Sequence, residues 1–262
     1  MDRLFDLVFV RPPPDSYVRC VSANPRRTEI NLGLAKEQHR QYVSTMRESG
    51  VDVVELPPLE DFPDSVFVQD PALLGSQRSI MGRFGEETRR GEEKALFDEL
   101  GNHRNEIGEN RFVKEPGTLE GGDILVTDRG LFVGESRRTN SNGIEQLAAY
   151  LSDSEVRRVK TDLLHLLCGC SYLSDGKMII APDLVSPSSF PGFEFVSLTF
   201  EEAYAADALY LGDGKIVIPS GFPEVSKKLE QAGYKGIEVD VSEFYKGDGG
   251  VTCLCSPVYR IL

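Results

Sequence analysis

Short apolar runs separated by tight turns recur along the whole chain. In residues 171–182 and 209–219, an Asp-Gly-Lys turn joins two apolar runs, and each copy ends in proline. An Asp-Gly pair between apolar residues favours a β-hairpin, because both turn positions need a positive φ angle. We therefore predict two hairpins here, and looser copies of the pattern predict three more, at residues 66–80, 122–133 and 251–262.

Helical spacing fills the gaps between these hairpins. Four segments place apolar residues three or four positions apart among charged ones, namely 34–48, 88–100, 143–151 and 223–232. Five hairpins with intervening helices give roughly 50 residues per unit, the period of a repeat or propeller architecture. We predict one α/β domain over residues 1–262, with equivalent strand ends meeting near a central axis. A plain α+β sandwich remains the alternative.

The charge balance narrows the class of partner. The chain has 29 basic and 42 acidic residues, for a formal net charge of −13. Such a surface repels nucleic acid and anionic lipid, so a neutral or cationic small molecule is the expected partner. No apolar run approaches the length of about 20 residues that a membrane span needs, and the apolar stretch near the N-terminus is too short for a signal peptide. We expect a cytoplasmic protein.

Cysteine offers three kinds of chemistry. The count of five is odd, which argues against a disulfide framework and leaves core thiols, a metal site or a nucleophile. A zinc site would draw on His165 and the pairs Cys168-Gly-Cys170 and Cys253-Leu-Cys255, but zinc motifs usually space their cysteines more widely. Cys253 follows a Gly-rich stretch that allows the backbone to approach a ligand closely. Taken alone, it is more often a core thiol.

Of the three histidines, His165 is the candidate for chemistry. It lies between leucines, whereas His39 and His103 occupy charged or polar stretches and are expected at the surface. A single histidine in an apolar run is more often a core residue than a catalytic one. The apolar setting therefore does not assign a function to His165.

Acids at the ends of apolar runs suggest a cation site. Asp64 and Asp70 flank one expected strand, and Leu119-Glu-Gly-Gly-Asp123 begins another. Carboxylates in such places are costly to bury unless they meet a cation. Arg83 and Arg138 supply the opposite sign, although each alone is typical of a surface. Together the two sets indicate a ligand with one cationic and one anionic end.

The ordered motifs resemble dimethylarginine dimethylaminohydrolase, of the guanidine-modifying or pentein superfamily. They are Asp64-Ser-Val-Phe-Val-Gln-Asp70, Arg83-Phe-Gly with Arg89-Arg90, Leu119-Glu-Gly-Gly-Asp123, Val133-Gly-Glu-Ser-Arg-Arg-Thr-Asn140, Leu164-His-Leu166 and Ser242-Glu-Phe-Tyr-Lys-Gly-Asp-Gly-Gly-Val-Thr-Cys253. The resemblance runs from about Arg11 to the C-terminus. It implies a five-bladed α/β propeller with pseudo-fivefold symmetry, in agreement with the repeat spacing.

The resemblance also implies roles for individual residues. Cys253 matches the nucleophile, His165 the general acid and base, and Glu120 the carboxylate that orients the histidine. Asp64 and Asp70 match the acids around the substrate guanidinium. Arg83 and Arg138 match the arginines that hold the substrate carboxylate, and Gly247 matches the position whose backbone carbonyl accepts the substrate amine. Residues 12–29 occupy the place of a mobile lid.

The implied reaction is hydrolysis of N-methylated arginine to citrulline and an amine through a covalent thiouronium, without metal or cofactor. Gln69 departs from the family, which usually has Glu there, so the lost charge leaves the substrate open. Arginine deiminase, citrulline hydrolase and arginine dihydrolase are alternatives within the superfamily. Outside enzymes, a non-catalytic propeller that binds ribosomes remains an alternative, which the acidic charge disfavours. A homodimer is also left open.

Overall fold

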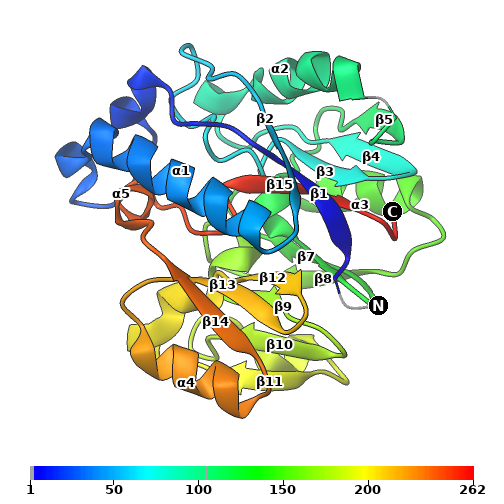
Figure 1. Cartoon of the computed structure of the whole chain (residues 1–262). Helices are drawn as coiled ribbons and strands as arrows, with labels where there is room; N and C mark the ends of the chain where they lie inside the picture. The colour runs from blue at the N-terminus through cyan, green and yellow to red at the C-terminus, as the bar shows by residue number, and fades with distance from the viewer. Residues whose placement is uncertain (1–2, 104) are drawn as a thin grey trace.

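The computed structural model describes residues 3–103 and 105–262, in which the strands form five sets of three (Figure 1). In each set the middle strand pairs antiparallel with one neighbour and parallel with the other. The sets are β3 (Ala72–Gly75), β4 (Arg78–Met81) and β5 (Glu109–Phe112); β6 (Ile124–Thr127), β7 (Gly130–Glu135) and β8 (Val156–Lys160); β9 (Cys170–Tyr172), β10 (Lys177–Ile180) and β11 (Glu194–Ser197); β12 (Leu209–Gly212), β13 (Lys215–Pro219) and β14 (Lys235–Val239); and β15 (Cys255–Tyr259), β1 (Phe5–Val10) and β2 (Asp52–Glu55).

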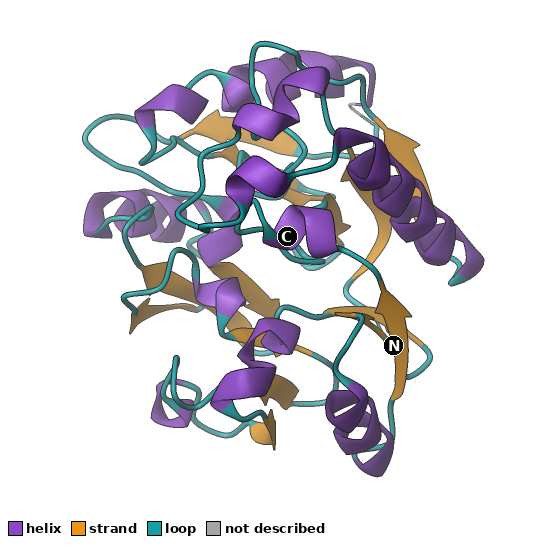
Figure 2. Cartoon of the chain, turned by 90° about the vertical axis from the view of Figure 1, so that its left-hand side faces the viewer, coloured by secondary structure: helices purple, strands orange, loops and turns teal. Residues whose placement is uncertain are grey.

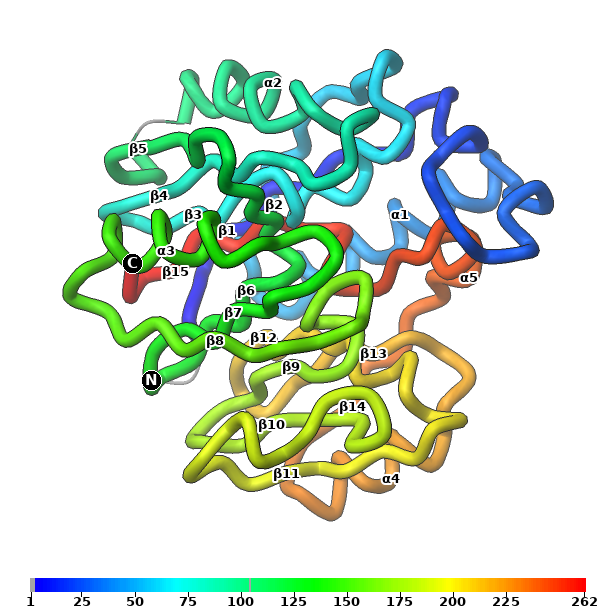
Figure 3. The backbone as a smooth tube through the Cα atoms, turned by 180° about the vertical axis from the view of Figure 1, so that it is seen from behind, coloured from blue at the N-terminus to red at the C-terminus, as the bar shows by residue number. Residues whose placement is uncertain are grey.

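The molecule is therefore an α/β protein with mixed sheets. A parallel contact between β15 and β3 joins two of the sets into one six-stranded sheet, and the other three remain separate. The set β6–β8 lies between β3–β5 and β9–β11 (Figure 3). The predicted hairpins at 122–133, 171–182 and 209–219 are confirmed. The Asp-Gly turns have the positive φ angles that the sequence predicts, with Asp175 and Asp213 both at 51°.

The predicted hairpin at 251–262 is wrong. This segment supplies the single strand β15, whose antiparallel partner is β1 from the other end of the chain. The prediction at 66–80 holds only for β3 and β4. Residues 64–70 form successive turns instead of a strand, with the Phe67 amide donating to the Asp64 carbonyl at 2.9 Å. Turns bring Asp64 and Asp70 to one cavity, whereas a straight strand would hold them about 20 Å apart on the same face.

All four predicted helices are present, and the longest lie at the periphery (Figure 2). The α-helices are α1 (Leu32–Glu48), α2 (Glu92–Glu99), α3 (Ser141–Tyr150), α4 (Pro223–Gln231) and α5 (Ser242–Tyr245). The helix expected at 88–100 is divided, because Gly91 has a φ of 113° and separates a 3-10 turn, Glu87–Arg89, from α2. Among the described residues, no helix has both the length and the hydropathy for a membrane crossing.

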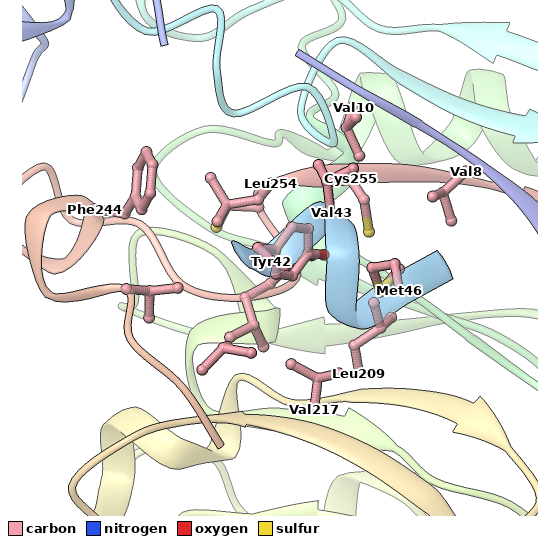
Figure 4. Close-up of a cluster of buried hydrophobic side chains, with 14 of the residues drawn as sticks. Val8, Val10, Tyr42, Val43, Met46, Leu209, Val217, Phe244, Leu254 and Cys255 are labelled. Carbon is pink, nitrogen blue, oxygen red and sulfur yellow. Dashed lines mark hydrogen bonds between the residues drawn. The ribbon is translucent and has the colours of Figure 1, made fainter. Parts of the chain in front are cut away.

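Helix α1 anchors the C-terminal segment. Tyr42, Val43 and Met46 of α1 pack toward β1 and β15 in one buried cluster (Figure 4). The Tyr42 hydroxyl donates to the Val251 carbonyl at 2.8 Å, just before Cys253. His39, expected at the surface, is only 1% exposed on the same helix, and burial lowers its pKa to about 4. The apolar cluster thus fixes the backbone on which Cys253 stands.

Candidate active site

Six of the residues singled out by sequence line one cavity. These are Asp64, Asp70, Arg138, His165, Gly247 and Cys253. They come from four separate segments of the chain, and Cys253 is 8% exposed. The sulfur near the C-terminus and the imidazole from mid-chain therefore face a common space.

His165 is held between carboxylates. Its Nε2 lies 2.8 Å from Glu120 Oε2, and its Nδ1 lies 3.7 Å from Asp70 Oδ1. Burial alone would lower the pKa of His165, but the charge of Asp70, the Glu120 hydrogen bond and the charge of Asp123 raise it to about 9. The imidazole is therefore a cation at neutral pH, with both ring nitrogens protonated.

Glu120 is fixed by contacts on both sides. Its Oε1 accepts from the Gly85 amide at 2.9 Å, and its own amide donates to Thr139 Oγ1 at 3.0 Å. A Cβ on Gly122 would lie 2.7 Å from His165 Nδ1, so glycine is required where the imidazole meets the following turn. Asp123 accepts from the Leu166 amide at 2.9 Å and so positions the chain next to His165.

The two aspartates differ in their partners. Asp70 accepts from Arg89 Nη1 at 2.6 Å, and Arg89 also pairs with Glu92 at 2.9 Å. Burial would raise the pKa of Asp70, but the charges of His165 and Arg89 hold it below its usual value. Asp64 accepts from the Val21 amide at 3.1 Å, and burial raises its pKa despite the charge of Arg89. A cationic ligand would therefore stabilise the ionised form of Asp64 more than that of Asp70.

Arg138 and Arg83 lie in different places. Arg138 lines the cavity with a side chain that is 13% exposed, and its buried Nη1 makes no hydrogen bond to a described residue. Arg83 is outside the cavity, where Nη1 donates to the Gly117 carbonyl at 3.3 Å and Nη2 lies 3.4 Å from Glu115. Arg89, six positions along the same motif, lines the cavity instead.

Gln69 also faces away from this cavity. Its side chain lines a separate interior space with Ser171 and Thr252, and its Oε1 is buried without a hydrogen-bond partner among the described residues. The Gln69 backbone amide remains near the site, 3.4 Å from the Cys253 carbonyl. The sequence-based placement of the Gln69 side chain in the ligand site is therefore not matched by the structure.

Cys253 has a neighbour that sequence reasoning missed. Its Sγ lies 3.8 Å from Oδ2 of Asp207, a buried carboxylate directly before β12. Asp207 Oδ1 accepts from the Thr252 amide at 2.8 Å. Burial, followed by the charges of Asp207 and Asp70, raises the pKa of the Cys253 thiol well above its usual value. An acid directly before an apolar run, the signal used for Glu120, would have found Asp207.

The segment expected to be a lid lies over the cavity. Residues 12–29 contain two 3-10 turns, Asp15–Arg19 and Arg27–Glu29. Val21 lines the cavity and bonds Asp64, and the Ala23 amide donates to Asp248 at 2.8 Å. With these contacts made, about 20 Å³ remains for the centres of water molecules, which is room for water but not for an amino acid.

One group of side chains has metal-ligand chemistry. Within the described part of the chain, Asp70, Glu120 and His165 place ligand atoms within 4.8 Å of one another. His165 Nε2 is hydrogen-bonded to Glu120, Nδ1 lies 3.7 Å from Asp70 Oδ1, and the raised pKa keeps the ring protonated, whereas a metal ligand needs a deprotonated nitrogen. Cys168, Cys170, Cys253 and Cys255, the possible ligands of a zinc site, are free thiols and do not belong to this group.

Sequence comparisons relate the chain to known proteins. A family model described as N,N dimethylarginine dimethylhydrolase, eukaryotic, matches residues 19–163. An uncharacterized protein of Aeropyrum pernix is 41% identical, over 100% of this chain and 98% of that protein. The N(G),N(G)-dimethylarginine dimethylaminohydrolase of Pseudomonas aeruginosa is 36% identical, over 96% of this chain and 98% of that enzyme.

A solved structure extends the similarity to the fold. A cysteine-to-serine variant of the Pseudomonas aeruginosa enzyme, in complex with citrulline, has a TM-score of 0.91 and 34% identity. The alignment covers 97% of this chain and 100% of that one. The chain therefore belongs to the dimethylarginine dimethylaminohydrolase family.

Proposed function

We propose that this chain hydrolyses N-methylated arginine to citrulline and a methylated amine, with Cys253 as the nucleophile. The observation that carries the proposal is the cavity shared by the Cys253 sulfur, the His165 cation and two aspartates. A flat cation held by Asp64 and Asp70 would present its central carbon to the sulfur. The family relationship and the citrulline complex of the Pseudomonas aeruginosa enzyme support the same reaction.

Each step uses a group with the chemistry it needs. The guanidinium is resonance-stabilised and a poor electrophile, so the site must position it against the sulfur. As the C–S bond forms, His165 donates its proton to the departing amine, and the C–N bond breaks to leave a thiouronium on Cys253. Neutral His165 then takes a proton from water, which attacks the same carbon. Collapse expels the sulfur and releases citrulline.

The other end of the substrate requires an anion site. We assign the substrate carboxylate to Arg138, which lines the cavity and whose buried Nη1 makes no hydrogen bond among the described residues and lies 3.7 Å from Glu120 Oε1. Arg89 lines the same cavity but is already paired with Asp70 and Glu92, so it is not assigned to the carboxylate. The Gly247 carbonyl is the proposed acceptor for the substrate amine, because Gly247 lines the cavity. Val21 must release Asp64 before an amino acid can enter, so residues 12–29 are the proposed lid.

The finer architecture is part of this proposal. We infer that the five three-stranded sets surround one axis, as in a five-bladed propeller. The support is positional, because an acid, a histidine or a cysteine stands just before the first strand of every set. In order these residues are Asp70, Glu120, His165, Asp207 and Cys253, before β3, β6, β9, β12 and β15. A common axis explains why five distant segments meet.

Product analysis tests the proposed reaction. The pure protein is incubated separately with asymmetric dimethylarginine, monomethylarginine, arginine, citrulline and agmatine. We expect citrulline with dimethylamine or methylamine from the first two. Ammonia from arginine at a higher kcat/KM would make the chain a deiminase, and ornithine would make it a dihydrolase or a citrulline hydrolase. No product from any of the five would contradict the proposed function.

The anion site gives a prediction that separates two arginines. Arg138→Ala should raise KM for dimethylarginine about 10-fold to 100-fold, the worth of one or two charge-assisted hydrogen bonds. KM for agmatine, which lacks the carboxylate, should change little. Arg83→Ala is the matched comparison and should leave both values near those of the parent. An increase with Arg83→Ala as large as with Arg138→Ala would restore Arg83 to the site.

His165 sets the alkaline limit of activity. Its pKa is raised to about 9, and only the protonated form can donate to the leaving amine. The single-turnover rate should therefore fall as pH rises through about 9. Glu120→Gln removes one of the charges that favour protonated His165, so this alkaline fall in rate should move to lower pH. If the pH of this fall in rate does not change in Glu120→Gln, His165 is not the titrating group.

A further inference from the structure

The thiol proton of Cys253 needs an acceptor, and His165 cannot be that acceptor at rest. Its pKa is raised to about 9, so both ring nitrogens carry protons at neutral pH, with Nε2 2.8 Å from Glu120 Oε2 and Nδ1 3.7 Å from Asp70 Oδ1, and neither offers a lone pair. Asp70 is itself engaged by Arg89 at 2.6 Å. Attack by a neutral thiol on a guanidinium is unfavourable, because the thiolate is the nucleophilic form. A separate base for the sulfur is therefore required.

Asp207 lies where that base would be. Its Oδ2 is 3.8 Å from Cys253 Sγ, and its Oδ1 is fixed by the Thr252 amide at 2.8 Å. Asp207 does not line the cavity that holds the other site residues, so it reaches the sulfur from behind. A Cβ on Gly250 would lie 2.2 Å from Asp207 Oδ2, so the Gly-rich loop leaves the space that this carboxylate fills.

The surroundings of Asp207 favour proton uptake. The titratable groups that face Asp207 are thiols, phenols and one carboxylate, none of them a cation. They are Tyr42, Asp70, Cys168, Tyr204, Cys253 and Cys255. Burial, with a contribution from the charge of Asp70, raises the pKa of Asp207 to about 6 despite the hydrogen bonds from Thr252 and Cys253. The carboxylate is thus ionised at neutral pH, yet it is a stronger base than an exposed aspartate.

We propose that Asp207 accepts the thiol proton of Cys253 as the sulfur attacks. The S–H bond breaks, an O–H bond forms on Oδ2, and the negative charge passes from carboxylate to sulfur without leaving the site. The C–S bond then forms, and His165 protonates the amine that departs. When the tetrahedral adduct of water and the thiouronium collapses, the C–S bond breaks, the hydroxyl proton of the adduct passes to solvent, and the expelled thiolate takes its proton back from Asp207. The proposal rests on the proposed function in that Cys253 is the nucleophile.

The dependence of Cys253 reactivity on pH tests this without any substrate. Alkylation of the native enzyme by iodoacetamide, followed by peptide mass spectrometry at Cys253, is timed between pH 5 and 9. With an internal acceptor, the rate should rise up to about pH 6 and then stay nearly level over about two pH units. A thiol that loses its proton to solvent would instead gain tenfold per pH unit throughout, and that result would overturn the proposal.

The variant Asp207→Asn keeps an acceptor for the Thr252 amide but cannot hold the proton. Single-turnover rates with dimethylarginine near pH 6.5 should fall about 100-fold or more, the usual worth of a general base. The difference in rate between Asp207→Asn and the parent should narrow as pH rises, because hydroxide from solvent then removes the thiol proton. Cys168→Ser, which changes a thiol that also faces Asp207, should keep the parent profile. An Asp207→Asn profile of parent shape, merely scaled down, would show a structural role and overturn the proposal.

The two readouts separate this inference from the function it rests on. If no guanidino compound is turned over but alkylation still shows the level region, the proposed reaction fails while the proton transfer to Asp207 stands. If dimethylarginine is hydrolysed and both profiles climb steadily with pH, the reaction stands and Asp207 is not the acceptor.

Discussion

Cys253→Ser abolishes turnover of dimethylarginine, with an expected loss of about 10⁴-fold or more, while substrate affinity stays within a few-fold of the parent. An alcohol at this position is a far weaker nucleophile than a thiolate, and no other described residue that lines the cavity carries a thiol or a hydroxyl. The proposed ionic contacts of the substrate involve Asp64, Asp70 and Arg138, so calorimetric titration should still detect binding. Steady-state rates and titration together check both parts.

Cys255→Ser is the matched control for this substitution. Cys255 is buried at the start of β15 and does not line the cavity, so its loss should leave the rate within a few-fold of the parent. A near-parent rate for Cys253→Ser would exclude Cys253 as the nucleophile. Loss of binding together with turnover would instead show that the sulfur is part of the binding site.

His165→Asn should lower kcat for dimethylarginine by about 100-fold to 10,000-fold, because the amide can face Glu120 but cannot donate a proton to the amine. The loss in the first chemical step should be much smaller with S-methyl-L-thiocitrulline, whose thiol leaving group departs without protonation. Comparing rates of amine and thiol release in stopped assays checks this difference.

His103→Asn serves as the control, because His103 does not line the cavity. Its rates with both substrates should match the parent. Equal losses for His165→Asn with the amine and the thiol leaving group would contradict the role of His165 as the acid for departure. Such a result would point to a role for the imidazole in holding the site together.

Local patterns were sufficient to predict most of the strands and helices. Asp175 and Asp213 stand at turns whose geometry depends on neighbouring residues alone, and both hairpins formed as expected. The partner of β15 could not be predicted in this way, because it is β1 at the opposite end of the chain. Pairing between the two ends depends on closure of the whole fold, which no local pattern contains.

Site residues likewise divide into those that sequence motifs predict and those whose place depends on the whole fold. Cys253, His165 and Glu120 were predicted from motif order, and the structure brings their segments together. The choice between Arg83 and Arg89 depends on where each guanidinium points, and composition does not reveal that direction. Arg89 is buried by Asp70 and Glu92, whereas Arg83 turns to Glu115. Asp207 shares with Glu120 the pattern of an acid before an apolar run, which would have marked it as a candidate, but its closeness to the sulfur exists only after folding.

Buried charge dominates the energetics of the site. Arg89, Asp70, His165 and Glu120 are each buried and share charges across short distances. Removing one member of such a network leaves its neighbours unpaired and costs about 3–5 kcal/mol. Conservative changes such as Glu120→Gln and Asp207→Asn are therefore better probes of chemistry than alanine variants, which would also test stability.

The most direct measurement is rapid acid quenching of the native enzyme during turnover, followed by peptide mass spectrometry. With dimethylarginine and with monomethylarginine, the peptide that contains Cys253 should gain the same added mass, because the methyl groups leave with the amine before water attacks. An adduct that keeps the methyl groups, or one on a peptide without Cys253, would contradict a thiouronium on this cysteine.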